Sequence, residues 1–246
     1  MTSPSQLLEA WVLGQAGSEA GWVAESLDAI ATQGRERDLH IFLGLAPRRL
    51  GKADLALSRS DLVAAGNARP GWSPDGWSID GAARVLALLR CPANRPFAER
   101  FKDLRRTADL SELIALYRGL PLYPDPETLD FEVGEGLRSN IRAVFEAIAH
   151  NNPFPRDHFD EHRWNHMILK ALFVDSRLSP ILGLKDRANR ELARILVDYA
   201  QERRAAGRPV SEELWIPVRP FRDDPEIAAR VAVAAAPYAF GKEAAR

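Results

Sequence analysis

Three of the five histidines in this chain stand at intervals of four residues, at positions 158, 162 and 166. With Glu161 between them, His158 and His162 spell H-x-x-E-H, the ligand pattern of one class of zinc peptidase. Side chains four residues apart on a helix are neighbours, so these two histidines could bind one metal ion in a metal-dependent hydrolase. A third protein ligand would come from elsewhere, and Glu191 and Asp198 are candidates. The alternative is a helix whose histidines face solvent or are satisfied within the core.

A second candidate site consists of polar residues on both sides of the turn HNNPFP, residues 150–155. Prolines fix the direction of the chain here, so the turn is either only a rigid connection or one wall of a pocket. Downstream, Asn165 and Lys170 interrupt an apolar helical segment, where a polar group needs a partner in the protein or in a ligand. The candidate ligand-binding residues of this pocket, between positions 138 and 170, are Arg138, Asn140, His150, Asn151, Trp164, Asn165 and Lys170.

Other motifs of catalysis and cofactor binding are absent from the sequence. It has no G-x-G-x-x-G fingerprint, no phosphate loop and no G-x-S-x-G nucleophile elbow. The loop GWSPDGWSID, residues 71–80, carries two tryptophans that either stack on a ligand or anchor the loop in the core. We expect no cofactor, and the sequence identifies no catalytic residue.

Composition excludes several classes of protein. The 246 residues include 33 Lys and Arg against 34 Asp and Glu, a formal net charge of -1 that provides no field for attracting nucleic acid. The single cysteine, Cys91, excludes an intramolecular disulfide and a zinc cluster of the CxxC type. No secretory signal is recognisable, and no apolar run approaches the roughly 18 residues of a membrane span. We therefore expect a soluble, cytoplasmic protein without a nucleic-acid partner.

The elements that must position these residues are helices. Apolar residues recur at helical spacing, and the alternation typical of strands is scarce. We predict an all-α array of about nine to eleven helices in right-handed, HEAT- or armadillo-like stacking, with an irregular helical bundle as the alternative. One helix should end at Pro47, one should cover residues 134–151 and another residues 157–174. Residues 1–246 then form a single domain, and a boundary at the Pro-rich loop near residues 121–126 is the alternative.

Four segments together resemble the EboA family of metabolite-traffic proteins. In chain order they are APRRLGKADL, ELIALYRGLPLYP, EGLRSNIRAVFEAIAHNNPFP and FDEHRWNHMILKALF, and the similarity runs from about residue 40 to residue 205. The family pattern has Arg-x-Asn, Asn-Pro-aromatic-Pro, an aromatic residue, Trp-Asn-x-Met and Leu-Lys-Ala-x-Phe. The matching residues are Arg138, Asn140, Asn152, Pro153, Phe154, Pro155, Phe159, Trp164, Asn165, Met167, Leu169, Lys170, Ala171 and Phe173. None of the three histidines belongs to this pattern, which favours the polar residues beside them over a metal site.

The resemblance implies a place in a pathway without a known reaction. The family is encoded beside a UbiA-type prenyltransferase, a TatD-like hydrolase, a cyclase similar to 3-dehydroquinate synthase and a sugar-isomerase-like protein, in a cluster linked to making or moving a secondary metabolite. We favour a non-catalytic helical scaffold or carrier that binds a metabolite intermediate or a partner protein of the cluster, with peripheral association with the membrane prenyltransferase as an option. The alternative is an enzyme of unfamiliar type acting on a cyclitol or isoprenoid intermediate, with Lys170 or His150 as base and with Arg138 and Asn165 holding the substrate. A metal-dependent hydrolase comes third.

Overall fold

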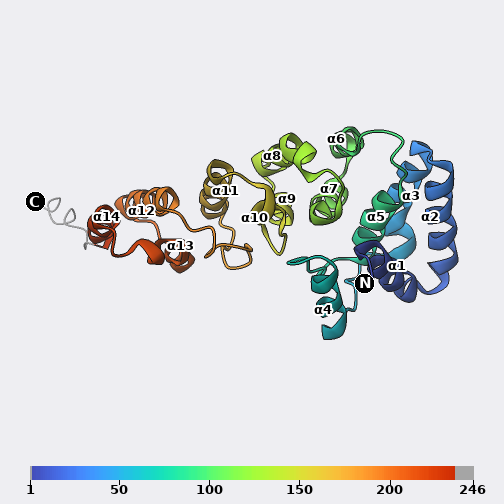
Figure 1. Cartoon of the computed structure of the whole chain (residues 1–246), viewed down its shortest axis with the longest axis horizontal. Helices are drawn as coiled ribbons and strands as arrows, with labels where there is room; N and C mark the ends of the chain where they lie inside the picture. The colour runs from blue at the N-terminus through green and yellow to red at the C-terminus, as the bar shows by residue number, and fades with distance from the viewer. Residues whose placement is uncertain (1, 236–246) are drawn as a thin grey trace, which may run out of the picture. The chain divides into compact units, whose positions relative to one another are not determined.

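The computed structural model describes residues 2–235. Within them, all regular secondary structure is helical (Figure 1). Fourteen α-helices and several short 3-10 turns make up the described chain, which contains no strand and one isolated bridge between Asp54 and Ser78. The prediction of an all-α array is confirmed. The predicted number of helices was too low because two of the expected long helices are broken and several short ones were not recognised. The HEAT- or armadillo-like stacking stays a prediction.

The chain divides into two compact units, residues 1–158 and residues 159–246. The Pro-rich loop near residues 121–126 lies inside the first unit, where it forms the 3-10 turns Leu120–Leu122 and Pro126–Leu129. Helices of the first unit are α1 Pro4–Gln15, α2 Ala20–Gln33, α3 Glu36–Leu50, α4 Arg59–Ala68, α5 Ile79–Arg90, α6 Phe97–Thr107, α7 Leu110–Arg118, α8 Asp130–Arg138, α9 Arg142–Ala149 and α10 Phe154–His158. Those of the second are α11 Glu161–Phe173, α12 Arg190–Ala205, α13 Trp215–Val218 and α14 Pro225–Ala235.

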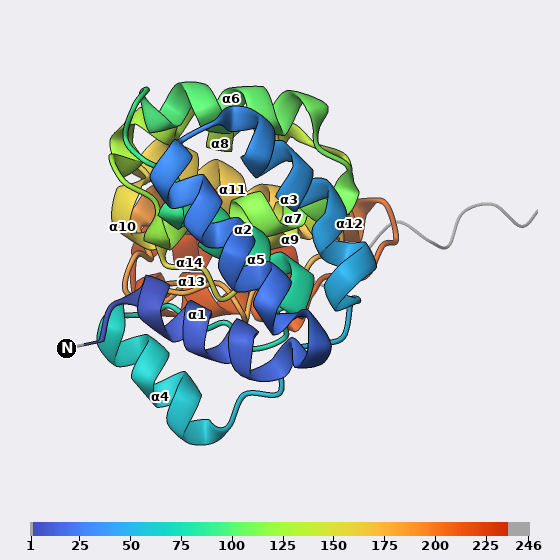
Figure 2. The same cartoon turned by 90° about the vertical axis from the view of Figure 1, so that its right-hand side faces the viewer.

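Helix α5 is the centre of the first unit. Nine of its twelve residues are buried, and the Ser78 side chain caps its first turn by accepting a hydrogen bond from the Gly81 N–H. Helices α1, α2, α3 and α7 all contact it, and Figure 2 shows α2 and α3 lying side by side over it. A helix whose residues are buried on nearly all sides has to be enclosed by its neighbours in this way.

Helix α3 does not end at Pro47 as predicted but continues to Leu50. Proline has no N–H, so it leaves the carbonyl four residues earlier, that of Leu43, without its helical partner. The Arg84 guanidinium of α5 supplies the missing donor, since its Nε lies 3.0 Å from the Leu43 oxygen. This contact between two helices allows α3 to tolerate the proline, and sequence periodicity within α3 could not reveal it.

The single helix predicted over residues 134–151 is wrong, because the chain forms α8 and α9 with a break between them. Ser139 leaves the helical conformation, with φ -55° and ψ 140°, and its hydroxyl accepts a hydrogen bond from the Ile141 N–H at 3.1 Å. A serine side chain that bonds to nearby backbone competes with helical hydrogen bonding in this way. Within α8, Gly136 allows a close approach, since a Cβ there would lie 2.4 Å from the Tyr117 ring.

The single helix predicted over residues 157–174 is also wrong. Helix α10 ends at His158, and Asp160 caps the new helix α11 by accepting a hydrogen bond from the Arg163 N–H at 2.7 Å. Aspartate is among the best helix caps, so its side chain favours a fresh helix start here. The boundary between the two compact units falls in this interruption.

Helix α12 organises the second unit. The Asn189 side chain caps it by accepting from the Leu192 N–H at 2.8 Å, and α11, α13 and α14 contact it. The alanine-rich segment predicted from residue 225 to residue 236 forms α14 and packs on α12, with Ile227 fully buried; Ala236 lies outside the described residues. Within residues 2–235, none of the helices has the length and apolar character needed to cross a bilayer.

Candidate functional site

The three histidines at four-residue intervals do not share one helix. His158 ends α10 in the first unit and packs on Phe154, with ring centroids 4.8 Å apart. His162 and His166 are exposed on α11 of the second unit, with ring centroids 4.1 Å apart. No group of three or more His, Cys, Asp or Glu side chains suited to a metal ion occurs within residues 2–235.

The candidate third ligands of a metal site are engaged by arginines on the second unit. Glu191 pairs with Arg194 at 2.6 Å, and Asp198 pairs with both Arg194 and Arg230. These ion pairs neutralise both carboxylates of α12, with arginines from α12 itself and from α14, so their presence needs no metal ion.

Asn165 and Trp164 are buried in the second unit. Asn165 and Asn189 exchange two amide hydrogen bonds, of 3.1 and 2.8 Å, so the polar group in this apolar helix has a protein partner at the start of α12. The Arg187 guanidinium lies 4.7 Å from the centroid of the Trp164 ring. Lys170 is partly buried on α11, and burial lowers the pKa of its ammonium group.

Arg138 and Asn140 are exposed around the break between α8 and α9. Arg138, whose side chain is 69% exposed, forms an ion pair with Glu135 on its own helix. Neither residue lines the cavity between α7 and α9, the one beside Arg84 or the one beside α12.

The turn at residues 150–155 is built around Asn152. Its amide Nδ2 donates to the carbonyls of Tyr117 and Ala147, at 3.0 and 3.1 Å, and its Oδ1 accepts from the Phe154 N–H at 3.0 Å. Asn152 is 3% exposed and its hydrogen-bonding capacity is largely used by the fold. Asn151 has a φ of 50°, a left-handed conformation that asparagine tolerates better than most residues, and its side chain is exposed.

His150 and Asn151 line a cavity of about 210 Å³ in the first unit, here called the α7–α9 cavity. The residues at positions 143, 146, 147 and 150 lie on one face of α9 and its C-cap, and they form one wall. Positions 114 and 118 of α7 form another. The loop after Trp72 closes it, anchored by the buried side chains of Trp72 and Trp77. The lining residues are Ser73, Asp75, Trp77, Ile114, Arg118, Ala143, Glu146, Ala147, His150, Asn151 and Asn152.

Arg118 brings a cationic group to this cavity. Its Nη1 donates to the Gly76 carbonyl at 2.9 Å, which ties the guanidinium to the closing loop. Burial lowers the pKa of the Arg118 guanidinium, and the charge of Asp54 opposes that shift. In the part of the chain that the structure describes, Arg118 makes no ion pair with a carboxylate, whereas the buried arginines Arg84 and Arg100 do.

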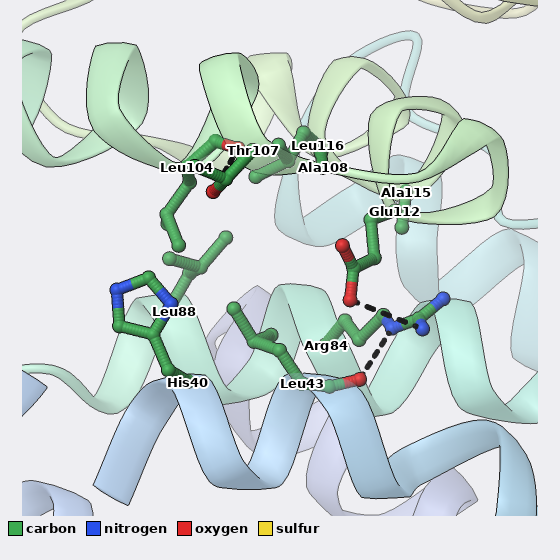
Figure 3. A pocket seen from close by; sticks show the side chains of 10 residues that line it. All are labelled: His40, Leu43, Arg84, Leu88, Leu104, Thr107, Ala108, Glu112, Ala115 and Leu116. Atoms are coloured by element: carbon green, nitrogen blue, oxygen red, sulfur yellow. Dashed lines mark hydrogen bonds and ion pairs between the residues drawn. The ribbon is translucent and has the colours of Figure 1, made fainter. Parts of the chain in front are cut away.

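A smaller cavity lies beside Arg84, between α3, α5, α6 and α7 (Figure 3). Figure 3 shows Arg84 reaching the Leu43 carbonyl on one side and Glu112 on the other. The free volume is about 40 Å³, roughly that of one water molecule in the liquid. This space is too small for a metabolite, and the groups beside it stabilise the core.

An open cavity of about 410 Å³ lies beside α12 in the second unit. Three of its charged residues are engaged within the protein. Glu213 accepts from the N–H groups of Leu178 and Ser179 and pairs with Arg177. Arg203 donates to the Pro209 carbonyl and lies over the Tyr199 ring. These contacts hold a loop against α12, so the α7–α9 cavity is the better candidate for a ligand.

Sequence reasoning did not select Arg118, although it lies in one of the segments quoted for the family resemblance. A basic residue in the last turn of a helix is ordinarily explained by the helix dipole, which hides a functional arginine. The spacing 143, 146, 147 and 150 was the available signal, since it places His150 and Glu146 on one face of α9.

The fold and this site define a class of all-helical proteins with a small polar cavity. The sequence model of the family described as "Metabolite traffic protein EboA" matches residues 4–219. The chain belongs to this family, and its general role is therefore in metabolite traffic. Neither a search among curated proteins nor a search among solved structures found a match.

Proposed function

We propose that this protein is a non-catalytic carrier that holds a small polar metabolite in the α7–α9 cavity. The observation that carries the proposal is the Arg118 guanidinium, which lines the cavity together with the Asn151 amide and makes no ion pair within the described residues. A cavity of about 210 Å³ has room for about seven water molecules, below the roughly 300 Å³ at which pockets for drug-sized ligands begin. A small metabolite fits such a volume.

The lining favours holding a ligand over transforming it. Covalent catalysis needs a nucleophile within hydrogen-bond reach of a base. Ser73 provides the one hydroxyl among the lining residues, and its oxygen accepts a hydrogen bond of 3.5 Å from the Asp75 N–H. No base contacts that hydroxyl in residues 2–235, so the nucleophile is not activated.

Blocking the cavity tests the proposal. Ala143 is exposed on α9 and lines the cavity, so Ala143→Phe should fill the opening without disturbing the core. The matched control is Ala24→Phe, also exposed on a helix but on α2 and away from the cavity. Each protein is incubated with a metabolite extract of its producing cells and measured by native mass spectrometry, with the denatured mass as reference.

We expect a small-molecule increment on the wild type and on Ala24→Phe that Ala143→Phe lacks. The molecule released on denaturation should have the same mass as the one in the extract, because no reaction occurs. A bare wild-type mass, or an increment that Ala143→Phe retains, would remove the cavity from consideration, and a released product of different mass would show an enzyme.

The other functions predicted from sequence stay predictions. One of them is the enzyme alternative, with Lys170 or His150 as base and with Arg138 and Asn165 holding the substrate. A partner protein from the same gene cluster, and peripheral association with a membrane prenyltransferase, are further expectations of the family resemblance. A protein partner would appear in the same native spectra as a large mass increment.

A further inference from the structure

We infer that the α7–α9 cavity selects a small hydroxylated monoanion, a carboxylate whose two oxygens bind the Arg118 guanidinium. The inference rests on the proposed carrier function and specifies its ligand. It draws on the hydrogen bonds of Arg118, on the groups opposite it, and on the balance of charge around the cavity.

The guanidinium has donors to spare. It carries five N–H groups, and the structure uses one nitrogen, Nη1, in the contact with the Gly76 carbonyl. Arg118 is half-buried at the cavity wall, so an acceptor from a ligand can take the place of water on the remaining donors. Carboxylate oxygens match the planar fork of arginine and bind it in pairs.

The position of Arg118 is set before any ligand arrives. Gly76 belongs to the closing loop, and the buried ring of Trp77 follows it directly. Because the loop is anchored, the guanidinium is held at the wall instead of sampling many rotamers. Such pre-organisation reduces the entropy cost of binding.

The other polar groups of the cavity lining suit hydroxyls. Asn151 offers an amide that both donates and accepts, and it makes no hydrogen bond through its side chain within residues 2–235. The Ser73 hydroxyl, the His150 imidazole and the carboxylates of Asp75 and Glu146 also line the cavity, together with Asn152, whose amide is used by the fold. Carboxylates accept hydrogen bonds from ligand hydroxyls, so a hydroxyl-bearing molecule is favoured over an apolar acid.

The carboxylates in the lining disfavour a second negative charge on the ligand. Asp75 and Glu146 oppose Arg118 at the cavity, although Glu146 also pairs with Arg142 at 2.7 Å. A second negative charge on the ligand would meet these carboxylates, and juxtaposed like charges are strongly unfavourable. The cavity should therefore prefer a carboxylate to a phosphate monoester of the same size.

Three matched six-carbon probes test this inference: D-gluconate, the neutral D-sorbitol and the dianionic D-sorbitol 6-phosphate. Binding is followed by nuclear magnetic resonance as the shift of the Arg118 Nε–H signal while each probe is added. The probe concentration rises to tens of millimolar, a range suited to dissociation constants of about 1 mM. We expect gluconate to bind at least about tenfold more tightly than either other probe. Weaker or absent binding of gluconate, or equal binding of all three, would overturn the inference.

Variants separate the charge from the fold. Arg118→Gln should abolish the preference for gluconate, Arg118→Lys should retain part of it, and Asn151→Gly should weaken binding while keeping the left-handed backbone. Shifts of neighbouring amide signals report binding in the variants that lack the Nε probe. Arg37→Gln, at an exposed arginine of α3 outside the cavity, is the control and should bind as the wild type does.

The outcomes also distinguish the two proposals. If the wild type binds a neutral molecule and Ala143→Phe does not, the carrier function stands and the inference of a monoanionic ligand is refuted. No increment in native spectra and no gluconate binding would refute both. Gluconate binding that Arg118→Gln leaves unchanged would locate the anion elsewhere.

Discussion

The contact between Arg84 and the proline-containing helix α3 predicts a large loss of stability in Arg84→Met. Arg84 and Asp80 have side chains 3% and 2% exposed and pair at 3.1 Å, and breaking a buried pair by removing one partner costs about 3–5 kcal/mol. The Leu43 carbonyl would also lose its donor, at about 1 kcal/mol. We therefore expect about 4 kcal/mol or more of lost unfolding free energy. For a chain of this size that lowers the melting temperature by about 8–16 °C.

The assay is thermal and urea unfolding followed by tryptophan fluorescence, with Arg138→Met as the exposed control. A second substitution tests the mechanism, because Pro47→Ala restores the helical N–H that bonds to the Leu43 carbonyl. Pro47→Ala should therefore stabilise the Arg84→Met background by about 1 kcal/mol more than it stabilises the wild type, where Arg84 already occupies that carbonyl. A loss for Arg84→Met as small as that for Arg138→Met, or an equal effect of Pro47→Ala in both backgrounds, would refute the reasoning.

Two further predictions concern packing and pH. Gly136→Ala places a Cβ 2.4 Å from the Tyr117 ring and should cost about 1–3 kcal/mol in urea unfolding, whereas Gly44→Ala, which meets open space, should not destabilise; equal effects would contradict this. Burial alone would raise the pKa of the Glu213 carboxyl. Hydrogen bonds from Ser179, Leu178 and Arg177 outweigh that effect, so the pKa in the folded protein lies below the ordinary value of 4.5. Stability from this carboxylate is present above the unfolded pKa and is lost as pH falls through the folded value. The stability advantage of the wild type over Glu213→Gln should thus shrink from about pH 6 to about pH 3, and a constant difference would contradict this.

Local signals in the sequence predicted the helices well where a cap lies beside a periodic segment. Ser3 caps α1 and forms a capping box with Gln6, and Gly34 ends α2 with a φ of 61°. The breaks at Ser139 and Asp160 were missed because apolar spacing continues across them. In both places a short polar side chain bonds to nearby backbone, which periodicity does not record.

The candidate site was predictable only in part. His150 and Asn151 were selected from the turn and do line the cavity, whereas Asn165 was selected for its burial and has a protein partner in Asn189. A buried polar residue predicts that some partner exists, and sequence alone does not say which. Arg118 was missed since its role depends on the loop at Gly76, which is brought to it by folding.

The α7–α9 cavity has a consequence for the order of events during synthesis of the chain. Residues 73–77, which close it, leave the ribosome well before residues 150–152, which complete its wall. Under the proposed carrier function, a nascent chain cannot retain a metabolite until nearly all of the first unit has been translated and folded. A chain truncated before the HNNPFP turn should then bind no metabolite, even where its N-terminal helices fold.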